Sequence, residues 1–315
     1  MSTPRMTPPQ LWQARAHAKV NLHLGVGQAR EDGFHELATV FQSLDIHDLV
    51  TYRWTEDITV EVTGQHSKGV PASTDNLAWR AVELVAQRLM VPATGTLTME
   101  KNIPAAGGMA GGSADAAAAL LLANHALSTE FRREPVTEEV LVELAAELGS
   151  DVPFTLMGGT ALGRGRGELL TPMLARGRYT WAIITSAEGL STPTVFRKLD
   201  ELRASGRGSA PHLDTEAVGQ ALVSGNPREL AAAVHNDLQP AALSLRPDLR
   251  KILDTGEAAG ALTGIVSGSG PTCAFLCEDA ETAAEVVASV CADNRGTRGL
   301  VTTGPAAGAS LVELS

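Results

Sequence analysis

The chain has 315 residues, of which 44% are hydrophobic and 19% charged, so it can bury a full core, which argues against global disorder. This length fits one large domain or two ordinary ones. The formal net charge of -11 argues against a nucleic-acid partner, since an acidic surface repels the phosphate backbone.

The start of the chain shows no secretory signal. The first ten residues are polar and Pro-rich, and the most apolar helical stretch, residues 116–127, is too short to cross a bilayer. The three cysteines, Cys273, Cys277 and Cys291, match neither a disulfide framework nor a common zinc spacing. We therefore expect a cytoplasmic protein with buried thiols and no membrane partner.

Strict alternation of apolar and polar residues marks the first elements. Residues 12–24 alternate, which predicts a strand with one face on a core. The same period places Lys19 and Asn21 side by side on the polar face. Residues 58–63 and 96–100 alternate in the same way and predict two further strands.

Helical spacing predicts the elements that follow. Helices are expected to begin near Asn76, near Ser113 in an alanine-rich run, and after Thr137, a typical N-cap residue. Later patterns predict strands at 160–162 and 179–185, a loop at 203–213, helices at 215–223, 227–235, 247–258 and 281–291, a strand–glycine turn–strand at 264–276, and a last strand. This order predicts two α+β lobes, residues 1–187 and 188–315.

A glycine-rich loop lies between a predicted strand and a predicted helix. It reads Pro104-Ala105-Ala106-Gly107-Gly108-Met109-Ala110-Gly111-Gly112-Ser113-Ala114-Asp115. Glycines let the backbone approach a ligand and a helix N-terminus attracts anions, so this order suits a phosphate. No Lys follows Gly112, so this is not a Walker A loop. The alternative is a flexible connection in which Ser113 simply caps the helix.

These residues resemble the phosphate-binding motif of the GHMP kinases, a Pro followed by Gly-Leu-Gly-Gly-Gly-Ser-Ser. Met109 and Ala110 stand near the Leu-Gly pair, and Ala114 replaces the second Ser. Ala18-Lys19-Val20-Asn21-Leu22 and Ser267-Gly268-Ser269-Gly270-Pro271-Thr272 resemble the first and third motifs in the correct order. The resemblance implies an α+β, two-lobed GHMP kinase fold. Its N-terminal lobe would be like a ribosomal-protein domain and its C-terminal lobe ferredoxin-like, with the active site in the cleft between them.

Other segments resemble one family of that superfamily, the diphosphocytidyl-methylerythritol kinases. Glu31-Asp32-Gly33-Phe34-His35-Glu36-Leu37 resembles their cytosine-recognising Asp-Gly-Tyr-His segment, with Phe34 in place of Tyr. Gly149-Ser150-Asp151-Val152-Pro153-Phe154 resembles the segment that holds their catalytic Asp, and Pro193 and Phe196 match a segment whose Phe packs on the cytosine. Judged by residue type alone, His35 is typical of a surface loop, Asp151 of a turn and Phe196 of a core.

The resemblance implies a role for each of the following residues. They are Lys19 and Asp151 in catalysis; Asn76, Lys101, Pro104, Ala105, Ala106, Gly107, Gly108, Met109, Ala110, Gly111, Gly112, Ser113 and Ala114 in ATP binding; and Asn21, Phe34, His35, Pro193 and Phe196 in substrate binding. Asn76 would lie near the adenine or ribose and Lys101 near a phosphate, although both residue types are more often plain surface residues. We assign no protein residue as a metal ligand.

The implied activity is transfer of the ATP γ-phosphoryl group to the 2-hydroxyl of 4-diphosphocytidyl-2-C-methyl-D-erythritol, in the non-mevalonate route to isoprenoids. ATP and Mg²⁺ are the implied cofactors, with Asp151 as base, Lys19 as its partner and Ser113 near the Mg²⁺. The only expected partner is this small-molecule substrate, bound by a monomer or homodimer. The alternatives are a GHMP kinase acting on homoserine or a mevalonate derivative, and a binding-only protein of the same fold.

Overall fold

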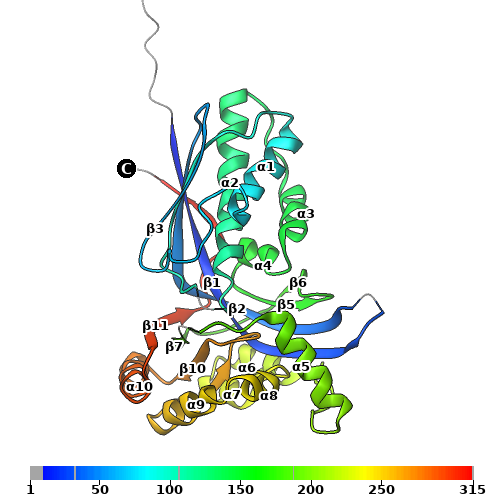
Figure 1. Ribbon diagram of the computed structural model, residues 1–315, viewed down its shortest axis with the longest axis vertical. Helices are drawn as coiled ribbons and strands as arrows, with labels where there is room; N and C mark the ends of the chain where they lie inside the picture. The colour runs from blue at the N-terminus through cyan, green and yellow to red at the C-terminus, as the bar shows by residue number, and fades with distance from the viewer. Residues whose placement is uncertain (1–9, 32, 106, 187, 314–315) are drawn as a thin grey trace, which may run out of the picture.

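The computed structural model describes residues 10–31, 33–105, 107–186 and 188–313. Among these residues the strands form two sheets, the larger in the upper half of Figure 1. The larger sheet has eight strands: β1 (Leu11–Ala29), β2 (His35–Arg53), β3 (Ile58–Thr63), β4 (Gly95–Glu100), β5 (Thr160–Arg164), β6 (Leu169–Pro172), β8 (His235–Asn236) and β12 (Ser310–Val312). Its main order is β12-β1-β2-β4-β3, while β5 pairs with β2 and β8 runs parallel to β1.

The hairpin of β1 and β2 connects the two halves of the molecule. The pairing of the two strands shifts between His17 and Ala18, between Asn21 and His23 and between Val26 and Ala29. Such irregularities bend strands, and in Figure 1 the hairpin leaves the upper sheet and reaches toward α5 (Thr192–Ala204). The bend brings the middle of β1 between the two lobes.

The strand predicted at residues 12–24 is confirmed, but the expectation of a single buried face is wrong. The polar side chains of β1 are buried as well, with His17, Lys19, Asn21 and His23 at 7%, 4%, 3% and 1% exposure. The turn at Gly268 lies over Asn21, and Nε2 of His23 lies 2.9 Å from the carbonyl oxygen of His212. The second half of the chain therefore covers the polar face that the sequence pattern assigned to solvent.

Four helices cover one face of the larger sheet: α1 (Leu77–Leu89), α2 (Gly111–Phe131), α3 (Glu138–Leu148) and α4 (Val152–Met157) (Figure 1). The first of them begins near Asn76 as predicted, and Asn76 caps it, because its side chain accepts a hydrogen bond from the Ala78 N–H at 2.9 Å. In α2 the alanines at 114 and 116–119 are fully buried. Their small side chains let α2 approach α1 and the sheet closely. Across the described residues, none of the helices is both long and apolar enough to span a membrane.

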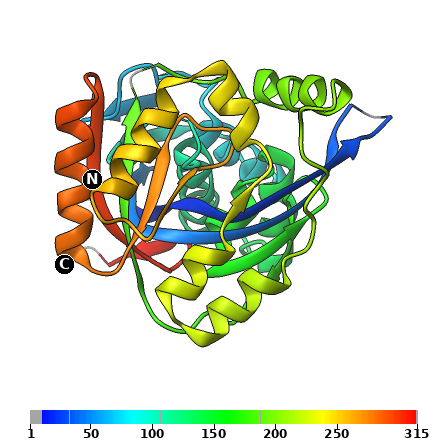
Figure 2. The ribbon, with the colours of Figure 1, turned by 90° about the horizontal axis from the view of Figure 1, so that it is seen from below.

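The second sheet has the antiparallel order β11-β7-β10-β9. Its strands are β7 (Tyr179–Ser186), β9 (Thr263–Val266), β10 (Cys273–Cys277) and β11 (Thr297–Gly304), and the helices around it are α6 (Glu216–Ser224), α7 (Pro227–Ala233), α8 (Gln239–Leu245), α9 (Asp248–Ala258) and α10 (Ala280–Asp293). Figure 2 shows these helices from below, with α10 in orange at the edge of the sheet. Cys273 and Cys277 are buried free thiols on β10, as expected.

The chain crosses between the two halves more than once. β7 pairs with β10 and β11 in the second sheet, whereas β8 and β12 return to β1 in the first. The division at residue 187 stays a prediction, and by sheet membership β7 lies with the second lobe. Most predicted elements are confirmed, while β2, β6, β8, β12, α4, α5 and α8 were not predicted.

Candidate active site

A cleft of about 1200 Å³ lies between the hairpin, the glycine loop and the start of α5. Its lining includes many of the predicted site residues: Lys19, Asn21, Phe34, His35, Lys101, Pro104, Ala105, Gly107, Gly108, Ala110, Gly111, Gly112, Asp151, Pro193 and Phe196. Residues far apart in the sequence thus meet in one cavity. Its size suits a pair of nucleotide-sized ligands.

The two residues predicted to be catalytic face each other in this cleft. Nζ of Lys19 lies 3.6 Å from Oδ2 of Asp151 and donates a hydrogen bond to Oδ1 of Asn21 at 2.8 Å. The side chain of Lys19 is only 5% exposed, whereas that of Asp151 is 32% exposed. A buried cation therefore holds a carboxylate that a substrate can still reach.

A chain of hydrogen bonds fixes the position of Lys19 and Asn21. Nδ2 of Asn21 donates to Oγ1 of Thr39 at 2.8 Å, and that hydroxyl donates to the carbonyl oxygen of His23 at 2.8 Å. The backbone N–H of Lys19 also donates to the carbonyl oxygen of Met109 in the glycine loop, at 3.2 Å. These bonds connect Lys19 to β2 and to the loop.

Asp151 lies in the short link between α3 and α4. Its carbonyl oxygen accepts a hydrogen bond from the Thr155 N–H at 3.1 Å, which begins α4. The Thr155 hydroxyl donates to the carbonyl oxygen of Ser113 at 3.1 Å, so α4 is attached to the first turn of α2. The carboxylate therefore has a set position relative to the glycine loop.

The glycine loop packs against the third motif. The hydroxyl of Ser267 donates to the carbonyl oxygen of Gly108 at 2.8 Å, and that of Thr272 donates to the carbonyl oxygen of Gly107 at 2.8 Å. Gly108 has φ +103°, and a Cβ there would lie 2.4 Å from the Ser267 carbonyl oxygen. Only glycine fits such a contact. Gly108 therefore lets the glycine loop pack directly against the third motif, which is distant in sequence.

The start of α2 suits an anion. The helix begins at Gly111, and its N-cap residue Ala110, at φ 59°, makes no side-chain capping bond within the described residues. A Cβ on Gly112 would meet nothing within 4 Å, so the backbone there borders open space. The first N–H groups of a helix have no partner within the helix. The alternative that Ser113 caps the helix is wrong, because Ser113 lies inside the first turn.

Lys101 is engaged inside the protein. Its Nζ pairs with the carboxylates of Asp48 and Asp115, and the side chain is 3% exposed. Burial opposes the charge of Lys101, but Asp115 and Asp48 outweigh burial and raise the pKa of the ammonium. Burial in turn raises the pKa of Asp115 to about 8, against the attraction of Lys101. The surface alternative is therefore wrong, and the ion pairs attach α2 to the strand before the loop.

The far end of the cleft holds an aromatic pair. Nε2 of His35 lies 2.9 Å from Oδ1 of Asp200, and its ring lies 5.1 Å from that of Phe196, centroid to centroid. His35 is 7% exposed, so it is not the surface residue that its type alone suggests. Asp200 and Phe196 occupy one face of α5, and Figure 2 shows this helix beside the tip of the hairpin.

The remaining predicted residues occupy several environments. Phe34 is 46% exposed, and Cζ of Arg166 lies 3.7 Å from its ring centroid. Pro193 lies in the first turn of α5. Asn76, Met109, Ser113 and Ala114 are outside the described lining of the cleft: Asn76 caps α1, Met109 and Ala114 are buried in the core, and Ser113 is half-buried. Ala106 lies outside the described residues.

Sequence reasoning missed several residues of the site. Asp200 and Thr39 hold predicted residues in place, and Asp48 pairs with Lys101. Asp115 belongs to the glycine motif, but the sequence indicated no role for it. Asp200 follows Phe196 by four residues, a helical spacing that could have predicted their shared face. Nothing local to Asp48 or Thr39 indicates their partners.

Comparison with known proteins agrees with this geometry. The family profile described as "GHMP kinases N terminal domain" matches residues 76–159, and "GHMP kinases C terminal" matches residues 220–296. A homoserine kinase structure from Cytophaga hutchinsonii, 17% identical, has a TM-score of 0.72 and covers 99% of this chain and 100% of its own, which shows the shared fold. Fold and site together define a small-molecule kinase of the GHMP class.

More similar relatives narrow the class. A 4-diphosphocytidyl-2-C-methyl-D-erythritol kinase of Corynebacterium diphtheriae is 52% identical over 94% of this chain and 96% of its own, and that of Mycolicibacterium smegmatis is 50% identical over 95% and 91%. A crystal structure of 4-(cytidine 5'-diphospho)-2C-methyl-D-erythritol kinase is 32% identical, with a TM-score of 0.73 over 92% of this chain and 98% of that one. The chain belongs to the family of 4-diphosphocytidyl-2-C-methyl-D-erythritol kinases, phosphotransferases with an alcohol acceptor.

Proposed function

We propose that this chain transfers the γ-phosphoryl group of ATP to the 2-hydroxyl of 4-diphosphocytidyl-2-C-methyl-D-erythritol, a step of the non-mevalonate route to isopentenyl and dimethylallyl diphosphate. The observation that carries the proposal is one cleft with a lysine–aspartate pair beside a glycine loop and a His–Phe pair at its far end. The first two parts suit phosphoryl transfer, and the third suits a planar base.

Asp151 is the group suited to remove the proton of the substrate hydroxyl. A base for this step has to stand within hydrogen-bond reach of the hydroxyl, and the partly exposed carboxylate of Asp151 lines the cleft. Lys19 orients Asp151 and offsets the negative charge that develops on the attacking oxygen and the transferred group. Because Asn21 and Thr39 hold Lys19 in place, this charge is preorganised rather than recruited during reaction.

The residues around α2 fit a nucleotide and its metal. The open backbone at Gly112 and the uncapped helix start suit the phosphates of ATP. Oδ1 of Asp115 is buried without a hydrogen-bond partner in the described structure and borders the cleft, as an Mg²⁺ ligand would. Ser113 and Asp115 would hold the ion, which when bound neutralises charge on the phosphates.

At the far end, His35 and Phe196 suit a cytosine ring. An imidazole fixed by Asp200 presents a defined edge to a base, and the tilted Phe196 ring offers a face to stack on. Phe34 stands where relatives of this family commonly have Tyr, so stacking is retained and a phenolic hydrogen bond is not available. We further propose that the enzyme works in the cytoplasm, which its free cysteines support, and that it is a monomer or homodimer.

An ADP-release assay with ATP and Mg²⁺ tests the proposal. It compares 4-diphosphocytidyl-2-C-methyl-D-erythritol with homoserine and mevalonate, with Asp151→Asn as the blank. We expect turnover with the cytidine compound alone, and its loss in the variant. Turnover with homoserine or mevalonate instead would discard the cytosine assignment, and no turnover with any acceptor would favour a binding-only protein.

A further inference from the structure

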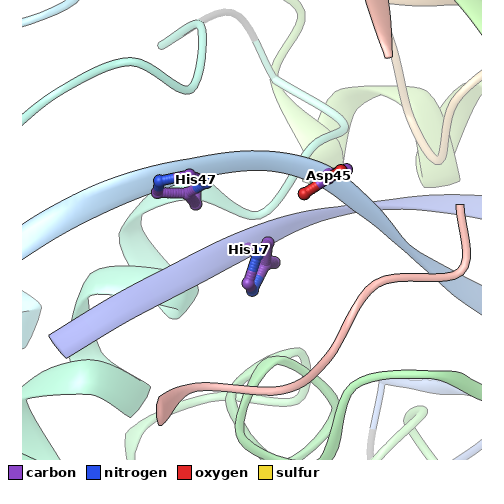
Figure 3. A group of neighbouring side chains, drawn as sticks. All are labelled: His17, Asp45 and His47. Atoms are coloured by element: carbon purple, nitrogen blue, oxygen red, sulfur yellow. The ribbon is translucent and has the colours of Figure 1, made fainter. Parts of the chain in front are cut away.

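Two histidines and a carboxylate gather outside the cleft, at a bulge between β1 and β2 (Figure 3). They are His17 on β1 and Asp45 and His47 on β2, and one ligand atom of each lies within 4.8 Å of the others. His17 pairs directly with His47, whereas the next residue on β1, Ala18, pairs with Leu44. The register shift therefore leaves Asp45 in the bulge, beside the two imidazoles, because bulges redirect side chains.

Both imidazoles have an unused nitrogen. Nδ1 of His17 and Nδ1 of His47 are buried, and within the described structure neither has a hydrogen-bond partner. His17 as a whole is 7% exposed, so water does not readily reach it. A buried polar atom without a partner is costly and uncommon in folded proteins. Two such atoms in a cluster that also holds the Asp45 carboxylate call for a shared ligand.

The second nitrogen of His17 supports the same conclusion. The backbone of Gly308 lies beside the His17 ring and offers an acceptor to the nitrogen that a metal would leave free. Histidines that bind metals commonly use one nitrogen for the ion and the other for a backbone carbonyl or a carboxylate.

We propose that His17, Asp45 and His47 bind a divalent transition metal ion, with Zn²⁺ as the best match to their chemistry. Two imidazoles and one carboxylate are a recurrent zinc donor set, and the half-exposed Asp45 leaves room for water as the fourth ligand. Mg²⁺ prefers oxygen ligands, so this site is distinct from that of the nucleotide. In a tetrahedral zinc site the ligand atoms are roughly 3.3 Å apart, which small side-chain rotations would reach.

Neighbouring residues would hold the carboxylate in place. Nη2 of Arg178 lies 2.6 Å from Oδ2 of Asp45, and Nε of Arg178 donates to Oγ1 of Thr303 at 2.9 Å. The metal would therefore bind the other carboxylate oxygen, with Arg178 as its outer partner. Arg178 precedes β7 and Thr303 lies on β11, so the ion would connect β1 and β2 and stabilise their junction with the second sheet.

Metal binding to the tag-free protein, first treated with a chelator, tests the proposal. Zn²⁺ affinity is measured by competition with a chromophoric chelator, Co²⁺ binding by visible absorption, and stability by thermal unfolding. We expect one Zn²⁺ per chain, a tetrahedral Co²⁺ spectrum and a rise of several degrees in Tm that Mg²⁺ does not reproduce. His47→Gln and Asp45→Asn each should lower the Zn²⁺ affinity at least about 100-fold, since even outer partners contribute 10- to 100-fold.

His212→Gln is the matched control, because His212 belongs to the other histidine group, with His23 and His235. It should bind Zn²⁺ as tightly as the unchanged chain. Unchanged binding in both His47→Gln and Asp45→Asn, or loss of binding in His212→Gln alone, would overturn the proposal. So would the absence of Zn²⁺ binding to a chain that unfolds cooperatively.

Discussion

Nζ of Lys19 lies 3.6 Å from Oδ2 of Asp151, although Lys19 comes from β1 and Asp151 from the link between α3 and α4. If Asp151 accepts the proton, Asp151→Asn should lower kcat by a factor on the order of 10²–10⁴. Lys19→Ala should lower it comparably, because the carboxylate loses its orientation. The KM for ATP should change much less, as the glycine loop is intact. Steady-state kinetics measure both; near-normal turnover in either variant would reject the assignment.

The His35 ring is held by Asp200 and lies tilted beside Phe196, at the end of the cleft proposed for cytosine, so its loss should affect one substrate only. His35→Ala should raise the KM for the cytidine substrate by about 10- to 100-fold, equivalent to the roughly 1–3 kcal/mol of a lost buried hydrogen bond. The KM for ATP should stay constant. Asp200→Asn, which keeps an acceptor for the imidazole, is the control and should have a smaller effect. Equal changes in the KM for ATP and the KM for the cytidine substrate would mean that His35 supports the folded structure and does not bind cytosine.

Local pattern predicted the elements whose residues alternate or repeat cleanly, such as β1, β3, β4 and α1. It failed for β2, because Gln42, Ser43 and Asp48 are polar yet buried, so no apolar face is visible in the sequence. Their burial is possible only because they bond to residues far along the chain, as Asp48 does to Lys101. Tertiary partners of this kind leave no local signal.

The same limit decides which residues of the candidate site could be predicted from the sequence. Lys19, Asp151 and the glycine loop were found because their short motifs resemble those of a family. The role of Lys101 could not be derived, since it depends on Asp48 and Asp115 meeting its ammonium from two other segments. The metal ligands His17, Asp45 and His47 depend on a register shift, which alternation alone does not predict.

Gly108 and Gly112 make a matched pair for testing the loop. Gly108→Ala should destabilise the protein by at least about 1–2 kcal/mol, the cost of a left-handed non-glycine residue, and more because its Cβ would meet Ser267. Gly112→Ala has no such neighbour and should fold normally. It should nevertheless raise the KM for ATP, since the methyl group would enter the phosphate site. Denaturant unfolding measures the loss of stability and steady-state kinetics the KM for ATP in both variants. Equal losses of stability in Gly108→Ala and Gly112→Ala would contradict the prediction.

Lys101→Met should destabilise the chain by about 3–5 kcal/mol, because it leaves Asp48 and Asp115 buried without their cation. Asp115→Asn is the control and should cost much less near neutral pH. Burial raises the pKa of this carboxyl, so Asp115→Asn removes a charge that the protein interior disfavours. Both are compared by urea unfolding without nucleotide. A stable Lys101→Met protein with only a raised KM for ATP would instead identify Lys101 as a phosphate ligand.

The buried His23 should lower the stability of the protein as the pH falls. Burial lowers the pKa of this imidazole below 6.5. The hydrogen bond to the His212 backbone opposes that shift, whereas the nearby imidazoles of His235 and His212 add to it. The unfolded chain therefore binds a proton at His23 before the folded chain does. Its contribution to stability is complete above pH 6.5 and is lost as the pH falls below that value.

Urea unfolding at several pH values from about 7.5 to 5.5 measures this contribution as the difference in the free energy of unfolding between the unchanged chain and His23→Gln. As the pH falls, the free energy of unfolding of the unchanged chain should decline relative to that of His23→Gln, with a difference in slope of up to one proton. His23→Gln also loses a buried contact, so its stability at pH 7.5 is compared separately from its slope. A slope equal to that of the unchanged chain would show that His23 does not carry the pH dependence.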